Sequence, residues 1–408
     1  MTQAQRQHVV IVGAGHGGSQ LAVSLRAEGY AGQITLIDAG DDLPYHKPPL
    51  SKTFLKSADA APQILRAAVV YDEAGVMRVT GTVTAIDPAA RVVTMDGRAI
   101  PYDDLVLATG AKNRMLPDLA GAANVHTLRD LTDATQMRNA LPGAERVLVV
   151  GGGFIGLETA AAVAQMGRQV TVLEAAPRVL VRVAAPETSE RVEATLRGLG
   201  IDLRTGWQGK GWRREGDRVV AVLGAEGEIP CDMILVGIGA EADTALASAA
   251  GITCNRGILT DGRLATSAHH VWAIGDVAET PHWQADGAPL RLESVQNATD
   301  QARHLARLLT KGDTAEFRTV PWFWSDIGPL KLQIAGLSDR ADRRLVRADD
   351  ARLAVFHFRD CVLVAVETLN SPADHMLARQ VLEAGRTPPD EVLMQGAAAI
   401  KAWAAAVA

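Results

Sequence analysis

One glycine pattern that occurs twice constrains the fold of this chain more than any other feature. The pattern G-x-G-x-x-G occupies residues 13–18 and 151–156, and each copy follows an apolar run. A second apolar run then ends in an acid, Asp38 at 25 residues from the first glycine and Glu174 at 23. A strand, a glycine turn, a helix and a second strand ending in an acid form a dinucleotide-binding βαβ unit. Two such units predict that the chain binds two dinucleotides.

The three glycines of each copy have different tasks. The first permits a tight turn, the second lets a pyrophosphate approach the backbone, and the third lets the helix pack closely on the sheet. The amino end of the helix offers N–H groups and a positive dipole to the phosphates. These positions are Gly13, Gly15 and Gly18 in the first copy and Gly151, Gly153 and Gly156 in the second. The acid accepts hydrogen bonds from an adenosine ribose and repels a 2′-phosphate, so Glu174 predicts NADH rather than NADPH.

Length and composition narrow the class of protein. A chain of 408 residues is too long to fold around one ordinary hydrophobic core, so its length predicts two or three domains. Hydrophobic residues make up 48% and charged residues 22%, as is typical of a soluble enzyme. The net charge is −6 and no long basic run occurs, which argues against nucleic acid as the main partner. No apolar stretch is long enough to span a bilayer, and residues 1–7 carry no signal peptide.

The cysteines and histidines predict neither a disulfide framework nor a metal site. Cys231, Cys254 and Cys361 are scattered along the chain, as expected of a protein from a reducing cytoplasm. The histidines show no metal-ligand spacing either: His8, His126, His269, His270 and His282.

The remaining pattern predicts an α/β fold with a smaller third part. The first unit covers residues 8–40. Alternating runs follow at 80–86 and 91–95, with a turn at 96–97, and then a strand at 102–111 that ends in small residues. The second unit begins at residue 146, with later strands at 219–223 and 232–239, and a helix is expected over 295–309. Beyond residue 321, strands at 331–335, 353–359 and 362–367, a helix at 373–384 and an alanine-rich tail predict a small α+β domain.

Short motifs along the whole chain resemble those of the glutathione-reductase-like flavoproteins. They are Ala108-Thr109-Gly110, Gly237-Ile238-Gly239 and Gly275-Asp276. The resemblance implies FAD on the first glycine pattern and NADH on the second. It also implies two Rossmann-like domains, with FAD bound by residues 1–110 and 240–320 and NADH by residues 111–239. Residues 321–408 would form the C-terminal α+β domain.

Three further segments narrow the resemblance. His46-Lys47-Pro48-Pro49-Leu50-Ser51-Lys52, residues 291–298 (RLESVQNA) and residues 321–326 (PWFWSD) with 330–336 (LKLQIAG) resemble segments of the putidaredoxin-reductase-like group. That group comprises ferredoxin reductases of bacterial oxygenase systems. The resemblance implies hydride transfer from NADH to FAD and then single electrons to a two-iron ferredoxin, which serves a cytochrome-type monooxygenase or a ring-hydroxylating dioxygenase. His46 and the stretch 327–329 depart from the group's usual residues.

The positions of the cysteines support this choice within the superfamily. Thioredoxin, lipoamide and glutathione reductases pass electrons from the flavin to a cysteine pair, and related peroxidases need one cysteine. The first half of this chain contains none. The sequence therefore predicts a one-electron acceptor, a quinone or oxygen.

The resemblance also implies which residues carry the chemistry. Lys52 and Glu158 would form an ion pair beside the flavin and act as the catalytic pair. The implied FAD residues are Gly13, Gly15, Gly18, Asp38, Lys47, Pro49, Lys52, Ala108, Thr109, Gly110, Asp276, Val295 and Trp324. The implied NADH residues are Gly151, Gly153, Phe154, Ile155, Gly156, Glu158, Glu174, Arg182 and Gly239. For Trp322 and Trp324 two interpretations stay open: one of them shields the flavin, or both are core aromatics.

The implied partner is an acidic ferredoxin, which would need a local excess of cations on a chain of net negative charge. The candidates are Arg303, Arg307, Lys331, Arg340, Arg343 and Arg344.

Two alternative functions share the expected fold. A membrane-associated NADH:quinone oxidoreductase would need an amphipathic C-terminus, and residues 397–408 lack a basic face. A redox protein similar to apoptosis-inducing factor would favour a targeting segment and a basic surface.

Overall fold

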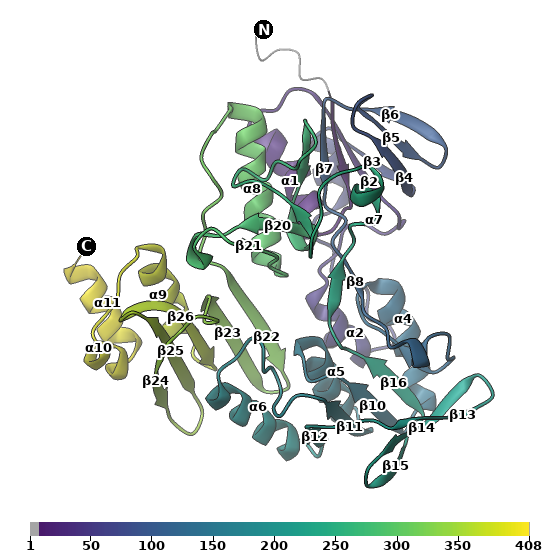
Figure 1. The fold of residues 1–408 in the computed structure, drawn as a ribbon, viewed down its shortest axis with the longest axis vertical. Coiled ribbons are helices and arrows are strands. Elements are labelled where there is room, and N and C mark those ends of the chain that lie inside the picture. Colours follow the sequence, from purple (N-terminus) through teal and green to yellow (C-terminus); the bar gives the residue numbers. More distant parts are fainter. Residues whose placement is uncertain (1–7, 408) are drawn as a thin grey trace. The chain divides into compact units, whose positions relative to one another are not determined.

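The computed structural model describes residues 8–407 and divides them into two compact units (Figure 1). Unit 1 takes residues 8–46, 63–112 and 241–321, and unit 2 takes residues 47–62, 113–240 and 322–407. Residues 1–7, for which we expected no signal peptide, and residue 408 of the alanine-rich tail lie outside the described residues.

Unit 1 is built on a five-stranded parallel sheet in the order β19-β7-β1-β2-β3. Its central strands are continuous runs of valine, isoleucine and leucine because helices and a ribbon cover both faces. On one face, α1 packs with α8, whose Leu305 and Ala306 are fully buried. The strands are β1 (His8–Val12), β2 (Gln33–Asp38), β3 (Val76–Thr80), β7 (Asp104–Leu107) and β19 (Val271–Ala273), and the helices are α1 (His16–Ala27) and α8 (Val295–Lys311).

A three-stranded antiparallel sheet, β4-β5-β6, belongs to unit 1 and corresponds to the alternating runs. The predicted turn is confirmed, because Asp96 and Gly97 both have positive φ, at 47° and 77°, between paired Met95 and Arg98. We had expected the run 80–86 to form one strand, but the structure divides it between β3 and β4. Thr80 ends β3, and the chain then turns at Gly81, where a Cβ would lie 2.5 Å from Asp96 Oδ2. The strands are β4 (Val83–Asp87), β5 (Val92–Met95) and β6 (Arg98–Pro101).

Unit 2 repeats the same plan. Its parallel sheet has the order β12-β11-β10-β16-β9, and an antiparallel ribbon, β13-β14-β15, precedes β16 as β4-β5-β6 precedes β7. The strands are β9 (Val125–His126), β10 (Arg146–Val150), β11 (Gln169–Glu174), β12 (Asp202–Thr205), β13 (Gly211–Glu215), β14 (Arg218–Gly224), β15 (Gly227–Pro230) and β16 (Met233–Val236). The helices are α4 (Leu131–Ala140), α5 (Phe154–Gln165) and α6 (Pro186–Gly198).

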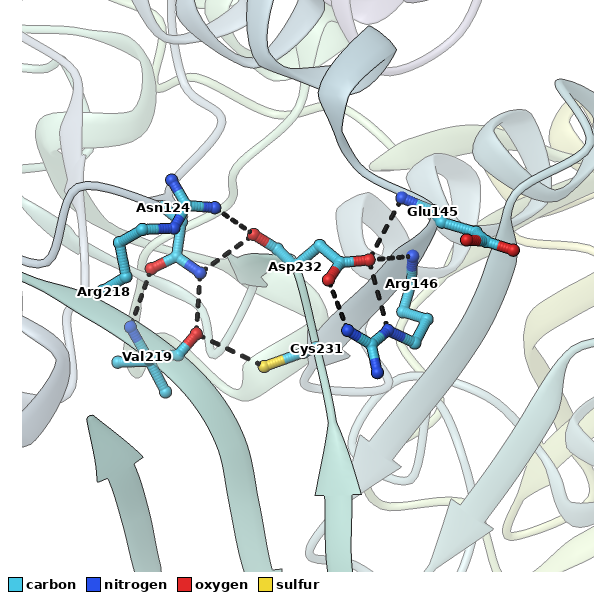
Figure 2. Close-up of polar contacts among 7 residues, drawn as sticks. All are labelled: Asn124, Glu145, Arg146, Arg218, Val219, Cys231 and Asp232. Carbon is cyan, nitrogen blue, oxygen red and sulfur yellow. Dashed lines mark hydrogen bonds and ion pairs between the residues drawn. The ribbon is translucent and has the colours of Figure 1, made fainter. Parts of the chain in front are cut away.

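A polar network ties the amino ends of β10 and β16 together (Figure 2). The Asp232 carboxylate accepts from the Arg146 N–H at 2.8 Å and from its guanidinium at 2.6 Å, which holds the pKa of Asp232 below its usual range. The Asn124 amide donates to the Val219 and Asp232 carbonyls at 2.7 and 2.9 Å. Burial raises the pKa of the neighbouring Cys231 thiol to about 11. Because the network lies at the amino ends of the strands, it stabilises the sheet at the edge opposite to a nucleotide site.

The C-terminal part of unit 2 is a five-stranded antiparallel sheet in the order β22-β23-β26-β25-β24 with three helices. The three predicted strands are present, but β22 and β24 were missed, because β22 carries aromatics at consecutive positions and β24 is rich in arginine. The alanine-rich tail is helical, as expected for the best helix former. The elements are β22 (Trp322–Ile327), β23 (Leu330–Gly336), β24 (Arg343–Ala348), β25 (Leu353–Arg359), β26 (Val362–Leu369), α9 (Pro372–Glu383), α10 (Asp390–Gln395) and α11 (Ala397–Ala406).

Short elements complete both units. They are η2 (Pro48–Ser51), α2 (Thr53–Lys56), α3 (Ala68–Glu73), β8 (Ala111–Asn113), η3 (Pro117–Leu119), η4 (Leu141–Gly143), β17 (Ala240–Ala242), α7 (Ala245–Ala249), β18 (Ile258–Leu259), η5 (Gly275–Val277), β20 (Ala278–Pro281), η6 (Trp283–Ala285) and β21 (Pro289–Leu290). The segment 47–62 is of particular interest. It lies in the connection from β2 to β3, yet it belongs to unit 2.

Candidate functional sites

The first glycine loop, residues 13–18, has the space that a pyrophosphate needs. Gly13 has φ 102°, and a Cβ there would lie 2.3 Å from the Ala108 carbonyl oxygen. A Cβ at Gly18 would lie 1.9 Å from the Gly13 carbonyl oxygen, so only glycine lets α1 pack this closely. At Gly15, by contrast, no described atom lies within 4 Å of the Cβ position. Gly15 is also the N-cap residue directly before α1, and no described side chain caps that helix, so the loop fits a phosphate group.

The second glycine loop, residues 151–156, repeats this geometry in unit 2. Gly151 has φ 111°, and its Cβ would lie 2.4 Å from the Gly237 carbonyl oxygen. A Cβ at Gly156 would lie 2.4 Å from the Gly151 carbonyl oxygen, whereas at Gly153 the nearest atom would be 3.9 Å away. Gly153 is the N-cap residue directly before α5, again without a side-chain cap among the described residues. Both loops therefore fit a dinucleotide, as their sequences predict.

The two acids lie at the ends of their strands, beside the glycine loops. Glu174 Oε2 accepts from the Gly152 N–H at 2.5 Å, and Oε1 accepts from the Ala176 N–H at 2.7 Å. Asp38 Oδ1 lies 3.4 Å from the Ala14 nitrogen, a much weaker contact. A carboxylate oxygen has two lone pairs, so Glu174 can still accept bonds from ribose hydroxyls.

The other predicted FAD residues of unit 1 lie at the carboxyl ends of its parallel strands. Ala108, Thr109 and Gly110 follow β7, and Asp276 follows β19. The carboxyl edge is where ligands bind to such sheets. Gln301, a buried residue of α8 that the sequence analysis missed, accepts from the Gly275 N–H at 2.7 Å and fixes the turn that carries Asp276. Val295 is the first residue of the same helix, α8.

Most predicted NADH residues of unit 2 also lie near its second glycine loop. The Phe154 ring packs against the Phe323 ring, with the centroids 4.5 Å apart and the planes tilted by 40°, while Ile155 is 43% exposed. Arg182 Nη2 lies 3.8 Å from where a Cβ of Gly239 would stand, so the guanidinium lies over the segment that follows β16.

Glu158 is the centre of a buried polar cluster in unit 2, which we call the Glu158 cluster. Its carboxylate is only 4% exposed and accepts from four donors. Lys52 Nζ lies 2.8 Å from Oε2, and Ser51 Oγ donates to the same oxygen at 2.6 Å. Ser325 Oγ donates to Oε1 at 2.6 Å, and the Asp326 N–H does so at 3.2 Å. The structure thus brings together the two predicted catalytic residues and adds two serines and a backbone N–H.

Three separate segments build the Glu158 cluster. Glu158 comes from α5, Ser51 and Lys52 from the segment 47–62, and Ser325 from β22. Lys52 Nζ also donates to the Pro48 carbonyl at 3.1 Å, which fixes the ammonium group from a second side. Lys47 precedes the 3-10 turn that contains Pro49. The two serines were missed although both stand inside motifs that the sequence analysis quoted, because a serine in a motif does not reveal its partner.

Trp322 and Trp324 lie side by side on β22, with ring centroids 5.5 Å apart, and both are half-buried. The Arg379 guanidinium lies 4.5 Å from the Trp322 ring, and His375 meets that ring edge-on at 5.8 Å. Burial, and secondarily Arg379, lowers the pKa of His375 to about 4. These contacts are those of packed aromatics, and a role of Trp324 at the flavin stays a prediction.

Most cations of the predicted docking surface already have acidic neighbours. Arg303 pairs with Asp300 at 2.8 Å and Arg343 with Asp390 at 2.6 Å. Arg307 and Arg344 approach Asp313 and Glu187 at 4.0 and 3.5 Å. For the side chain of Lys331, the described part of the chain offers no ion pair.

No group of three or more His, Cys, Asp or Glu side chains that could hold a metal occurs in residues 8–407. Among the histidines, His8 Nε2 lies 2.8 Å from Thr35 Oγ1, and His282 caps a 3-10 turn by accepting from the Gln284 N–H. The three cysteines are free in the described chain. None of the described helices has the length and apolar character needed to cross a membrane.

Comparison with known proteins places this geometry in a family. Residues 7–302 match the pyridine nucleotide-disulphide oxidoreductase family, and residues 322–404 match the reductase C-terminal family. A ferredoxin–NAD(P)(+) reductase of a Sphingomonas species is 39% identical over 92% of both chains. Putidaredoxin reductase of Pseudomonas putida is 40% identical over 92% of this chain and 91% of its own.

A solved structure agrees with these matches. The covalent putidaredoxin reductase–putidaredoxin complex contains a chain that is 37% identical, with a TM-score of 0.91 over 98% of both chains. The cofactors of this family are FAD and a nicotinamide nucleotide, which the two glycine loops fit. The chain therefore belongs to the pyridine nucleotide-disulphide oxidoreductase family and, within it, to the ferredoxin reductases that include putidaredoxin reductase.

Proposed function

We propose that this protein is an NADH:ferredoxin oxidoreductase, which takes a hydride from NADH and delivers single electrons to a two-iron ferredoxin of an oxygenase system. The observation that carries the proposal is the pair of glycine loops, each open at its middle glycine, in a chain whose relatives are ferredoxin reductases. The absence of cysteine before residue 231 leaves no thiol relay in the first half.

The division of labour follows the two loops. The first glycine loop and the carboxyl edge around Asp38, Thr109 and Asp276 would hold FAD. The second loop, with Glu174 and Arg182, would hold NADH. When bound, FAD accepts a two-electron hydride and releases electrons singly. The corresponding domains would be residues 1–110 with 240–320 for FAD, 111–239 for NADH and 321–408 for the C-terminal part. The segment 47–62 would then belong to the FAD-binding domain by its place in the sequence, although the structure groups it with unit 2.

The Glu158 cluster is proposed to orient polar groups for the reaction rather than to hold a phosphate. Four donors fix the Glu158 carboxylate in one position, and Lys52 is fixed by both Glu158 and the Pro48 carbonyl. Groups that are immobile before the reaction cost no reorganisation during it. The role of this pair at the flavin is implied by the family resemblance and stays a proposal.

Charge attraction is proposed to guide an acidic ferredoxin to the protein. Because Arg303 and Arg343 are each paired with an acid, they carry little net field beyond their partners. Lys331 is the most effective single cation of the set, since it forms no ion pair among the described residues, although Asp326 is its cross-strand partner on β22. The free cysteines agree with a cytoplasmic location, which is part of the same proposal. The names of the relatives favour a ferredoxin acceptor over a quinone or a role like that of apoptosis-inducing factor.

The test uses the purified protein. We expect one FAD per chain, NADH-dependent reduction of ferricyanide, and reduction of cytochrome c that requires an added two-iron ferredoxin. Ferredoxin-dependent turnover should fall as salt rises, because exposed charges are screened beyond about 8 Å at physiological ionic strength. Lys331→Glu should raise the ferredoxin concentration needed for half-maximal rate by roughly threefold, with ferricyanide reduction unchanged. A protein without flavin, or one indifferent to every two-iron ferredoxin tried, would contradict the proposal.

A further inference from the structure

Glu367 is a fully buried acid that the proposed reaction does not use. It lies on β26 with no exposed surface, and both of its carboxylate oxygens accept from the Ala185 N–H, at 2.9 and 3.0 Å. His357 Nε2, on the neighbouring strand β25, donates to Oε1 at 2.8 Å. A buried carboxylate is costly unless it is paired and hydrogen-bonded, so its position inside the C-terminal sheet requires a specific partner. Its partners are the His357 ring on β25 and a backbone N–H 182 residues away in sequence.

Ala185 ends a loop that begins directly after Glu174, which we call the 175–185 loop. The loop returns to the second glycine loop at Leu180, whose N–H donates to the Gly152 carbonyl at 3.0 Å. Leu180 has φ 53°, a left-handed conformation that is strained for a residue with a Cβ. Such a conformation persists only where contacts on both sides hold it. On the C-terminal side, the Leu180 carbonyl accepts from the Val183 and Ala184 N–H groups at 3.0 Å, and Glu367 holds the next residue, Ala185.

The part of the loop between these two fixed points carries Arg182. Its guanidinium lies across Gly239, as described above, and its neighbours Val181 and Val183 are 39% and 42% exposed. The same loop lies against Gly152, so Arg182 is presented at the edge of the second glycine loop. A cation at that place is suited to a phosphate or ribose group of a nucleotide.

We infer that Glu367 and His357 are positioning residues for nucleotide binding. The C-terminal sheet holds the 175–185 loop through the Ala185 N–H and thereby keeps Arg182 at the second glycine loop. The affinity for NADH then depends on a buried pair on β25 and β26, two strands that carry none of the predicted NADH residues. This inference rests on the proposed binding of NADH by the second glycine loop.

The experiment compares Glu367→Leu and Glu367→Gln with a matched control in the flavin-loaded protein. Thr368→Val is the control, because Thr368 is the next residue of β26, is equally buried, and bonds to the Gln333 carbonyl instead of the loop. With ferricyanide as acceptor, Glu367→Leu should raise the KM and the dissociation constant for NADH roughly tenfold, as expected for loss of a hydrogen bond to a charged group. The kcat at saturating NADH should stay within about twofold.

Two further readouts separate a positioning role from general damage. Glu367→Gln keeps an acceptor for the Ala185 N–H, so it should restore most of the affinity, with a KM raised roughly twofold. Trypsin should cut after Arg178 or Arg182 faster in Glu367→Leu than in the parent or in Thr368→Val, because the loop is released. If Glu367→Leu fails to fold, Glu367→Gln and His357→Gln still test the loop by these two measurements.

The outcomes are distinct. Unchanged NADH affinity and unchanged trypsin cleavage in both Glu367 variants would overturn this inference and leave the proposed function intact. An equal loss of NADH affinity in Thr368→Val would overturn it as well, since the effect would then be general to the strand. If the parent protein itself fails to bind NADH, the proposed function falls and the inference falls with it.

Discussion

The two glycine loops of this protein have nearly the same backbone but different surroundings. In both loops, a Cβ added at the first or third glycine would lie too close to a backbone carbonyl oxygen. These distances are 2.3 and 1.9 Å in the first loop and 2.4 and 2.4 Å in the second. The acids differ, since Glu174 is bound to its loop at 2.5 Å while Asp38 reaches only to 3.4 Å. The two βαβ units therefore share a loop geometry that fits a phosphate group, and they differ in how the acid at the strand end contacts that loop.

The same position on the two fingerprint helices shows the difference most clearly. Two residues after the last glycine, α1 carries Gln20 and α5 carries Glu158. Gln20, which is half-buried, accepts from the Arg66 guanidinium at 2.6 Å and donates to Ser24 at 2.8 Å. Glu158 is buried among four donors. The comparison teaches that one copy of the repeat keeps a structural contact at the place where the other carries a candidate reactive group.

The largest effects are expected from adding a methyl group at the third glycine of each loop. In Gly18→Ala and Gly156→Ala the new Cβ meets a backbone oxygen that cannot move away, so overpacking costs about 3 kcal/mol in each case. Gly18→Ala should lose FAD, whereas Gly156→Ala should keep FAD and lose NADH oxidation. Flavin content and NADH kinetics measure both. Loss of FAD from Gly156→Ala as readily as from Gly18→Ala would remove the proposed division between the loops.

The next largest effect concerns the position two residues after the last glycine, where α5 carries Glu158 and α1 carries Gln20. Glu158→Gln and Lys52→Ala should slow flavin reduction by NADH roughly 10- to 100-fold, ~1.4–2.7 kcal/mol of barrier, with FAD content unchanged. Lys56→Ala is the matched control, since Lys56 also reaches α5 from the segment 47–62, at Gln165, but is exposed. Gln20→Ala should leave the reduction rate at the parental value. Stopped-flow rates that are equal in all four variants would refute a role of the Glu158 cluster in the reaction.

The acids at the strand ends give a smaller and more specific effect. Glu174→Gln keeps an acceptor for the Gly152 N–H but removes the charge that repels a 2′-phosphate. We expect the preference for NADH over NADPH to narrow about tenfold, since like charges near 4 Å repel by roughly 1–4 kcal/mol. Asp38→Asn should leave that preference alone. The ratio of kcat/KM for the two nucleotides decides the matter, and an unchanged ratio in Glu174→Gln would mean that another group selects the nucleotide.

The last prediction concerns acid stability at the C-terminal part of unit 2 rather than catalysis. His375 has a folded pKa of about 4 against 6.5, so below pH 6.5 the unfolded chain binds a proton that the folded chain does not. Stability from this group is therefore present above pH 6.5 and lost as the pH falls toward 4, by about 2 kcal/mol between pH 6.5 and 5. His375→Gln should flatten this slope. Thermal unfolding midpoints at pH 6.5 and 5 test it, and parallel slopes for parent and variant would show that His375 does not contribute.

Much of the local structure could be read from the sequence because its causes are local. Gly13, Gly151, Asp38 and Glu174 stand where a strand–turn–helix–strand pattern places them, within 25 residues of one another in each unit. The Asp96-Gly97 turn followed from the preference of such pairs for positive φ. Errors arose where local pattern misleads: Gly81 breaks an alternating run, and consecutive aromatics conceal β22. The proposed roles of individual site residues stay predictions.

What the sequence by itself determined about this protein is its repeated βαβ architecture, its two phosphate loops and the pair of charges that meet at Glu158. Only the tertiary structure decided which distant residues complete each polar cluster. Ser51 and Ser325 reach Glu158 across 107 and 167 residues, and Glu367 reaches Ala185 across 182. Hydrogen bonds between distant segments leave no periodic trace in either segment, because each residue is compatible with its own strand or helix regardless of its partner. The fold alone brings such groups within bonding distance.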